Sequence, residues 1–260
     1  MDYATGETFK LAVGKPGLPF VHVRINGEDV ELVLDLGNMT GLAISPALAQ
    51  RLRLPSTGEW TSYDSAGSAR GRHQVFSAHT VAAFGRTWTN VRVYETADDR
   101  LPGLIGPCFL QGRRFTVDYA TGTIAVTDRP SPANDTRGAA IPLVPSQALP
   151  GLLVAEGRVN GTQVLMELDS GKTRTCVDPK LIEAAKLPAT GHGYRIDRLE
   201  LGPRSFAVPH AKKVSFSGIS RGLANPILVG VGSDVLSQMV FTVDYRGQVL
   251  IIDDSLNRQR

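Results

Sequence analysis

The sequence has few cysteines, little net charge and no long apolar run, and each absence removes a class of protein. No apolar run approaches the roughly 20 residues that a membrane-spanning helix needs. The net charge of +3 comes from 28 basic and 25 acidic residues that are interspersed. We therefore expect no nucleic-acid partner and no polybasic membrane anchor. The two cysteines, Cys108 and Cys176, are too few and too far apart for a zinc site, so we interpret them as structural thiols.

Signals for other hydrolase chemistries are also missing. The histidines at positions 22, 73, 79, 192 and 210 show no metal-ligand spacing, so no metal site is predicted. The serines lack a nucleophile elbow, which argues against a serine hydrolase. No cofactor is expected. The opening stretch MDYATGETFK lacks the charged and apolar segments of a signal peptide. We interpret it as a start that follows a removed leader and expect a periplasmic or exported protein rather than a cytoplasmic one, although two free thiols do not exclude the cytoplasm.

An internal repeat organises the chain. VRINGEDVELVLDLGN (residues 23–38) aligns with GRVNGTQVLMELDSGK (residues 157–172), which places Asp35 over Asp169 at an offset of 134 positions. After it, SPALAQRLRLP (45–55) aligns with DPKLIEAAKLP (178–188), and FTVDY occurs at both 115–119 and 241–245. The repeat therefore predicts two related lobes.

Each lobe is predicted to be mostly β. The segments VHVRI, VELVL, FTVDY and TIAV are rich in β-branched and aromatic residues and are separated by Asn-Gly, Ala-Thr-Gly or Arg-Gly turns. Only the two segments that begin with Ser-Pro and Asp-Pro are predicted to be helical. The polar, Pro- and Gly-rich stretch after the first lobe reads as a linker. The expected domains are residues 1–128, the linker 129–138 and residues 139–260.

The two lobes differ in one long excursion. From Leu54 to Gly85 is 31 positions, whereas from Leu187 to Gly202 is only 15. The extra residues of the first lobe include YDSAGSARGRHQV (63–75), which we predict to form a glycine-tipped hairpin with a mobile tip. This hairpin would act as a flap over a cleft between the lobes, and its predicted flap residues are Tyr63, Ala66, Gly67 and Ser68.

These residues together resemble the aspartic proteases. The resemblance rests on Asp-Ser-Gly at 169–171, its echo Asp-Leu-Gly at 35–37, and in each lobe a later glycine element (104–106 and 230–232) followed by Phe-Thr-Val-Asp-Tyr. It covers about residues 18 to 253 and is closest to the bacterial retropepsin-like proteins in a single-chain, two-lobed, pepsin-like form. A single Asp before Gly is usually a turn former, and it is the duplication in matching order that gives the pattern its weight.

The resemblance implies a bilobal acid-protease fold in which Asp35 and Asp169 meet at the lobe interface. Two adjacent carboxylates cannot both ionise cheaply, so one acts as base and the other as acid on a water that attacks a peptide bond. Gly37 and Gly171 are expected to leave backbone amides free for the carboxylates. The expected partner is a peptide or protein substrate, and the chain is expected to be a monomer.

One residue departs from the family pattern. Members usually carry Thr or Ser after the catalytic Asp, and its hydroxyl bonds across to the opposite lobe. Ser170 can do this, but Leu36 cannot. Two hypotheses stay open: an aspartic endopeptidase that tolerates Leu36, and a pseudoprotease whose cleft only binds peptide or a protein partner. An unrelated all-β binding module is a more distant third.

Overall fold

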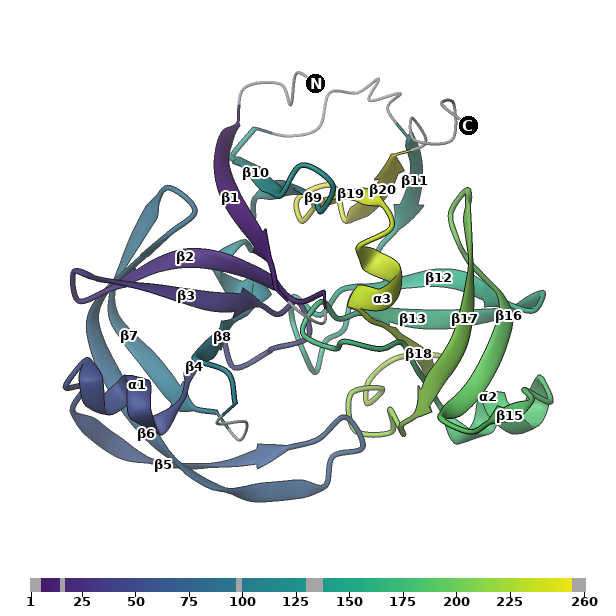
Figure 1. The fold of residues 1–260 in the computed structure, drawn as a ribbon, viewed down its shortest axis with the longest axis horizontal. Helices are drawn as coiled ribbons and strands as arrows, with labels where there is room; N and C mark the ends of the chain where they lie inside the picture. Colours follow the sequence, from purple (N-terminus) through teal and green to yellow (C-terminus); the bar gives the residue numbers. More distant parts are fainter. Residues whose placement is uncertain (1–5, 15–16, 97–99, 130–137, 254–260) are drawn as a thin grey trace.

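The computed structural model describes residues 6–14, 17–96, 100–129 and 138–253, and it confirms the predicted fold class. The chain is mostly β, and its two lobes lie side by side beneath a sheet to which both contribute (Figure 1). In the described part of the chain, no helix is long and apolar enough to cross a membrane.

The strands of the first half follow one another along the chain as β1 Glu7–Val13, β2 Pro19–Ile25, β3 Glu28–Leu34, β4 Leu42–Ile44, β5 Ser56–Tyr63, β6 Ala69–Ala83, β7 Arg86–Glu95, β8 Gly103–Ile105, β9 Arg114–Asp118 and β10 Thr123–Thr127. Those of the second half are β11 Gly138–Pro142, β12 Val154–Val159, β13 Thr162–Leu168, β14 Cys176–Val177, β15 Ala189–Thr190, β16 Gly193–Leu201, β17 Arg204–Lys213, β18 Ile227–Val231, β19 Val240–Asp244 and β20 Val249–Asp253.

Short helices interrupt these strands. The two predicted helices are present as α1 Pro46–Arg51 and α2 Pro179–Ala184, and each is capped by the polar residue before its proline. The structure adds α3 Ser233–Leu236 and the 3₁₀ turn η1 Pro107–Phe109, which the sequence analysis did not predict. Neither has a side-chain cap, and both are too short to show a helical period, so the proline that begins η1 was not enough to predict it.

Both lobes repeat one arrangement around their Asp-x-Gly turns. In the first lobe β3 runs parallel to β8, with Leu34 paired to Ile105. In the second lobe β13 runs parallel to β18, with Leu168 paired to Val231. Each Asp-x-Gly turn therefore follows directly on a buried strand that is hydrogen-bonded to a parallel neighbour. This pairing fixes the position of the aspartate, which is the first residue after the strand.

A shared sheet joins the lobes. The two Phe-Thr-Val-Asp-Tyr segments form β9 and β19, and these strands pair antiparallel with each other. Thr116 lies opposite Thr242, and their hydroxyl oxygens are 2.7 Å apart. The sheet order β20-β19-β9-β10-β1-β2 then carries the hydrogen-bond ladder from one half of the chain into the other.

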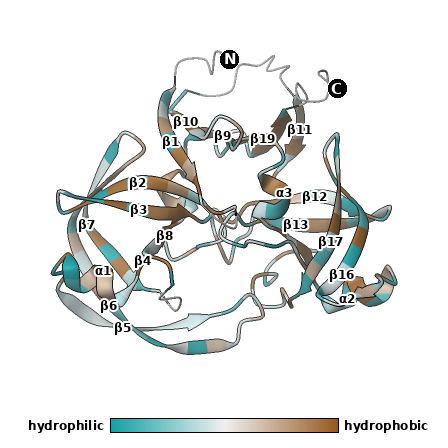
Figure 2. Cartoon of the chain, in the orientation of Figure 1, coloured by the Kyte–Doolittle hydropathy of each residue, from teal (hydrophilic) through white to brown (hydrophobic). Residues whose placement is uncertain are grey.

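The apolar core is continuous across this junction. One cluster of buried side chains includes Val21 and Leu34 from the first lobe together with Leu168 and Phe241 from the second. Figure 2 shows hydrophobic residues concentrated on β2 and β3, whereas the β5–β6 hairpin is pale to hydrophilic over much of its length. Burial of this core is the main term that holds the two lobes in register.

The predicted linker falls mostly outside the described residues. β10 ends at Thr127 and β11 begins at Gly138, and residues 130–137 between them are not described. We propose the divisions 1–128 and 139–260 as the two lobes, because β11 pairs with β20 at the end of the chain rather than with its sequence neighbour.

Candidate functional site

Asp35 stands at the first residue after β3, and its position is fixed by backbone hydrogen bonds. Its amide donates to the Ile105 carbonyl at 3.0 Å, which continues the β3–β8 pairing by one residue. Its carboxylate oxygen Oδ1 accepts from the Gly37 amide at 2.9 Å. One oxygen of the carboxyl is thus held by its own turn, and Oδ2 is left to face the second lobe.

Asp169 is held in the same way after β13. Its amide donates to the Val231 carbonyl at 3.0 Å, and its Oδ1 accepts from the amides of Gly171 and Lys172, both at 3.1 Å. The two turns therefore have matching backbone geometry, as their sequence repeat implies. Asp169 is buried, whereas Asp35 is half-buried.

The two glycines allow the carboxyl groups to approach each other's turns. A Cβ atom on Gly37 would lie 2.5 Å from Cγ of Asp169, and a Cβ on Gly171 would lie closer still to Cγ of Asp35. Each carboxyl group occupies the space that a side chain on the opposite glycine would fill. The structure thus brings the four residues predicted from the repeat together at one point between the lobes.

Ser170 ties the two turns together from below. Its hydroxyl donates to the Leu34 carbonyl at 2.6 Å and accepts from the Leu36 amide at 3.1 Å, so one side chain bonds twice across the interface. Ser170 is buried, where such bonds are protected from water. Its own carbonyl accepts from the hydroxyl of Ser233 at 2.7 Å, which connects α3 to the turn.

The pKa of Asp35 is raised well above its usual range. The largest cause is removal of water from around the carboxyl, followed by the negative charge of Asp169 and a hydrogen bond between the two carboxyl groups. The charge of Lys172 and the Gly37 amide act in the opposite direction. A carboxyl with a raised pKa keeps its proton at higher pH, which is the property a general acid needs.

Lys172 and Glu167 were not predicted to belong to the site. The ammonium of Lys172 donates to Oε2 of Glu167 at 3.0 Å and also to Oδ2 of Asp169. It lies 5.6 Å from the centre of the Phe216 ring. Glu167 is 3% exposed and lies on the face of β13 that packs against Phe216, and burial raises its pKa to about 7.

The internal repeat contained a signal for this pair. The residues of the first lobe at the matching positions are Val33 and Asn38. Val33 is fully buried, and the Asn38 side chain bonds within its own turn, to Thr40 and Gly41. The first lobe thus has a neutral pair where the second lobe has the charged pair Glu167 and Lys172. A position-by-position comparison of the two repeats shows this difference.

The predicted flap is the hairpin of β5 and β6. Tyr63 pairs with Ala69, and the tip between them is closed by Asp64, whose side chain accepts from the amides of Ala66 and Ser68. Gly67 has a φ of +83°, a conformation that favours glycine. The Tyr63 side chain is exposed.

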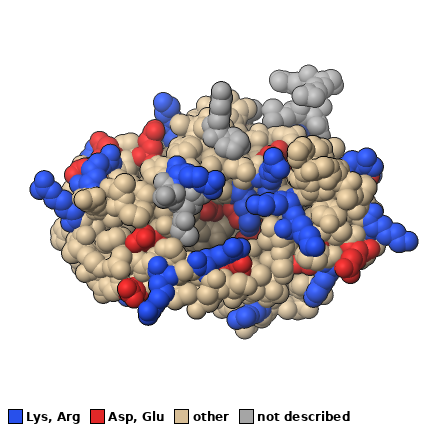
Figure 3. Space-filling model, turned by 60° about the horizontal axis from the view of Figure 1, so that its bottom comes forward, with Lys and Arg blue, Asp and Glu red and all other residues tan. Residues whose placement is uncertain are grey.

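The tip of this hairpin contacts the second lobe. The Ser65 carbonyl accepts from the amides of Gly218 and Ile219, at 3.0 and 3.2 Å, and the Ser217 hydroxyl donates to the Ala66 carbonyl at 3.1 Å. Figure 1 shows the hairpin reaching from the first lobe to the loop after β17 along the lower side of the molecule. Seen from that side, Figure 3 shows acidic side chains in a hollow near the centre, with Lys and Arg side chains beside it.

We expect the Gly218→Ala variant to release the flap tip. A Cβ on Gly218 would overlap the Gly67 backbone nitrogen, so the hairpin must move away. Hydrogen exchange of the amides in residues 64–68 should become faster than in the parent, because the loop no longer holds the tip. Gly191→Ala is the matched control, since a Cβ there meets no atom within 4 Å. Equal exchange in both variants would contradict the contact.

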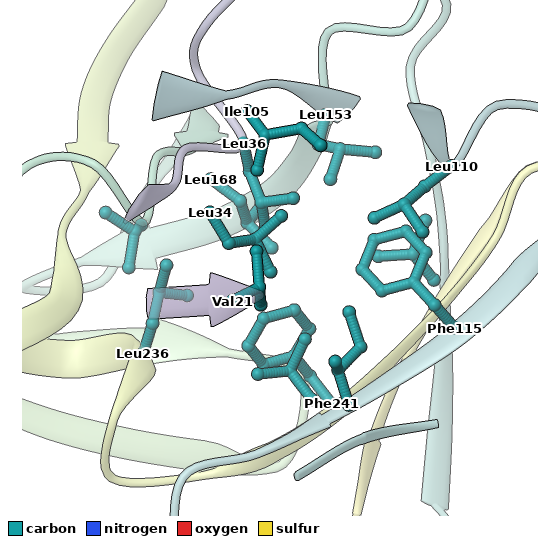
Figure 4. Packing of buried hydrophobic residues seen from close by; sticks show 14 of the residues in the cluster. Val21, Leu34, Leu36, Ile105, Leu110, Phe115, Leu153, Leu168, Leu236 and Phe241 are labelled. Carbon is teal, nitrogen blue, oxygen red and sulfur yellow. The ribbon is translucent and has the colours of Figure 1, made fainter. Parts of the chain in front are cut away.

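Leu36 points into the apolar core. It is fully buried and packs with Leu34, Ile105, Leu153 and Leu168 beneath the turns (Figure 4). By the repeat, a hydroxyl here would face the Ser170 amide and the Leu168 carbonyl. The Leu36 side chain instead packs in the core. The lobe interface is therefore stabilised by the Ser170 hydroxyl from the second lobe and by the apolar contacts of Leu36 from the first.

Comparison of Leu36→Thr with Leu36→Val isolates the missing hydroxyl. Thr and Val have nearly the same shape and both are smaller than Leu, so both variants should be less stable than the parent by about 1–3 kcal/mol. We expect Thr to be more stable than Val by about 0.5–1.5 kcal/mol, because its hydroxyl completes the second cross-lobe hydrogen bond. Chemical denaturation of the two variants measures the difference. A less stable Thr variant would mean that the hydroxyl is buried without a partner.

Two further patterns carry no site. The prediction that the serines lack a nucleophile-elbow pattern was wrong at the level of sequence, because residues 218–222 read Gly-Ile-Ser-Arg-Gly. These residues lie in an irregular loop with no helix directly after them, so they do not form the strand-turn-helix of a nucleophile elbow. The Ser220 hydroxyl donates to the Phe216 carbonyl. Among the described residues, no group of three or more His, Cys, Asp and Glu side chains is arranged to hold a metal ion.

Comparison with known proteins gives a family match in the first lobe. Residues 21–109 match the sequence profile of the aspartyl protease family. This segment lies in the first lobe and includes Asp35 and the β5–β6 hairpin. No curated protein matches the sequence at a significant level. The chain thus carries an aspartyl protease signature in its first lobe, and its mostly-β, two-lobed architecture is consistent with a bilobal aspartic protease fold.

Proposed function

We propose that this protein is an aspartic-type endopeptidase whose catalytic residues are Asp35 and Asp169. The observation that carries the proposal is the mutual approach of the two carboxyl groups, each set against the glycine of the opposite turn. The raised pKa of Asp35 supports it, because a pair that shares one proton supplies an acid and a base at the same pH.

The chemistry needs one ionised carboxylate, one carboxylic acid and a water molecule between them. The carboxylate takes a proton from the water as the water oxygen bonds to the peptide carbon, and the acid gives its proton to the carbonyl oxygen. The resulting diol breaks its C–N bond when a carboxyl group protonates the leaving nitrogen. Ser170 and the two glycines hold the groups in place, and such positioning is a large part of the rate gain.

The substrate is proposed to be an extended peptide. A chain segment in the cleft would meet the backbone of the β5–β6 hairpin, and strand-like pairing with such an edge gives affinity that depends little on side-chain sequence. The hydrogen bonds between Ser65 and the loop at Gly218 join the hairpin to the second lobe, which supports a role for the hairpin as a flap over one side of the proposed cleft. Entry of a long substrate would require these hydrogen bonds to open.

A second candidate function is that of a pseudoprotease that binds peptide or a protein partner without cleaving it. Two observations favour it: Leu36 provides no hydroxyl for the lobe interface, and Asp169 is paired with the Lys172 ammonium. An ion pair on one carboxylate could stabilise the ground state more than the transition state, which would slow cleavage.

Incubation with a mixed peptide library distinguishes the two functions. Cleavage is measured from about pH 3 to about pH 8, with and without a statine peptide that mimics the transition state. Inhibitor-sensitive cleavage by the parent that disappears in Asp169→Asn supports the endopeptidase. Cleavage that survives this substitution would refute the dyad mechanism. Peptide binding without cleavage at any pH would favour the pseudoprotease.

A further inference from the structure

We propose that Lys172 decides which carboxyl of the pair holds the proton. In this proposal Lys172 keeps the negative charge on Asp169, so that Asp169 is the base and Asp35 is the acid. The inference rests on the proposed function for its catalytic meaning, but the location of the proton is a property of the folded protein that can be measured without any substrate.

The geometry of the ammonium is the first argument. Lys172 follows Gly171 directly, and its Nζ bridges Oε2 of Glu167 and Oδ2 of Asp169. An ammonium group only donates hydrogen bonds, so it favours an acceptor that is ionised. Burial alone would lower the pKa of Lys172. Attraction to the charges of Asp169 and Glu167 outweighs this effect and raises the pKa of Lys172 above its usual value. The lysine is therefore a permanent cation at this oxygen.

The asymmetry between the lobes is the second argument. Asn38 occupies the matching position in the first lobe, and its side chain bonds to Thr40 and Gly41 instead of Asp35. Asp35 thus has no cation in its own turn, although it feels Lys172 from across the interface. Two adjacent carboxylates cannot both ionise cheaply. The proton therefore stays on the carboxyl whose negative charge is less stabilised by a neighbouring cation, which is Asp35.

A simpler reading is that Lys172 serves only Glu167. A buried carboxylate on an apolar strand face needs a counter-ion, and Lys172 supplies it. A lysine bound to Glu167 alone would not need to reach Asp169, however, and this one contacts both. The other groups around the ammonium are the Asp35 carboxyl, the Phe216 ring and the Cys176 thiol, which also feels Lys212 on β17.

The proposal assigns each proton in the reaction. Asp169 takes a proton from the water, the water oxygen bonds to the peptide carbon, and Asp35 gives its proton to the carbonyl oxygen. In the second step Asp169 gives its proton to the leaving nitrogen as the C–N bond breaks. Asp35 recovers its proton from a diol hydroxyl as the carboxylic acid product forms. The pair then returns to its starting state, and no other reactant is consumed.

Carbon NMR of protein labelled with ¹³C in the Asp carboxyl groups tests the assignment. The signals are assigned with Asp35→Asn and Asp169→Asn and followed as the pH is raised. In the parent, Asp169 should ionise first and Asp35 only at higher pH. If Asp35 ionises first, the proposal is wrong, whatever the variants do.

The matched variant copies the first lobe into the second. Glu167→Val/Lys172→Asn removes the cation together with its buried partner, which avoids stranding a charge in the core. The pH at which Asp169 ionises should rise by about 1–3 pH units, because an opposite charge at contact distance has been lost. Lys180→Asn, at an exposed lysine on α2, is the control and should leave both titrations unchanged.

Glu167→Gln separates the two roles of the lysine. It keeps the ammonium beside Asp169, so the order of ionisation should stay as in the parent. An unchanged Asp169 titration in the double variant would overturn the proposal, and the parent titration decides the matter if the double variant fails to fold. Where cleavage is present, the acid limb of its pH profile should move with Asp169. Absence of cleavage by the parent at every pH would count against the proposed function, while the carbon titrations would still decide the proton assignment.

Discussion

Replacement of Asp169 by asparagine is expected to reduce peptide cleavage by at least about 100-fold, the contribution of a well-placed general base. The amide keeps the shape of the carboxyl group and an acceptor for the Gly171 amide, so the turn should be preserved. It cannot take a proton from water. Lys172 keeps Glu167 as its partner, so no buried charge is left alone. Cleavage rates of parent and variant, measured with thermal unfolding on the same samples, check this result.

Asp244→Asn is the control for this prediction. Asp244 is also buried and is the last residue of an apolar strand, but its carboxylate accepts from the amides of Arg246 and Gly247 and closes the turn after β19. Asparagine retains an acceptor for those amides, so cleavage should stay near the parent rate. A comparable loss of cleavage in both variants would show that the effect of Asp169→Asn comes from the fold rather than from the chemistry.

Substitution of Gly171 by alanine should be the most disruptive single methyl addition at the site. The new Cβ would overlap the Asp35 carboxyl, so either the turn or the carboxyl must move. We expect a loss of about 1–3 kcal/mol in the free energy of unfolding, as for other overpacked positions. A displacement of about 1 Å at a reacting group lowers the rate by about 100-fold. Chemical denaturation and cleavage assays measure the two effects.

Gly37→Ala gives the symmetric test. Its Cβ would lie 2.5 Å from Cγ of Asp169, which is a less severe overlap than at Gly171, so we expect smaller losses of the same kind. Gly191→Ala, where a Cβ has open space, should change neither stability nor cleavage. If Gly171→Ala were as stable and as active as this control, the two carboxyl groups could not lie against the opposite turns as described.

The fold class and the close approach of the two Asp-x-Gly turns could be predicted from the sequence, because both follow from one internal repeat. Equal segments fold alike, and equivalent turns at residues 35–37 and 169–171 meet only near the axis that relates them. The helices at Pro46 and Pro179 were predictable for a local reason, since cap and proline lie next to each other in sequence.

Long-range contacts were beyond the sequence analysis. The hydrogen bonds from Gly218 and Ser217 to the flap tip join segments about 150 positions apart, and no local pattern marks either side. From the sequence, Leu36 could be described only as a missing hydroxyl. Its packing was not visible there, because its neighbours in the core come from both lobes. The sequence alone did not single out Lys172. Its role depends on Glu167, whose burial only the fold reveals.

The pairing of β9 with β19 bears on how such a chain arose. Thr116 lies opposite Thr242, which is the equivalent residue of the second repeat. Around this pair the ladder is symmetric, because Phe115 lies opposite Val243 and the equivalent residues Val117 and Phe241 also pair. An edge that pairs with its own copy is an isologous interface, which two separate single lobes could form as a homodimer. Joining the copies in one polypeptide makes their association independent of concentration. It also frees each copy to mutate alone, so one half can acquire a lysine beside its aspartate while the other keeps an asparagine.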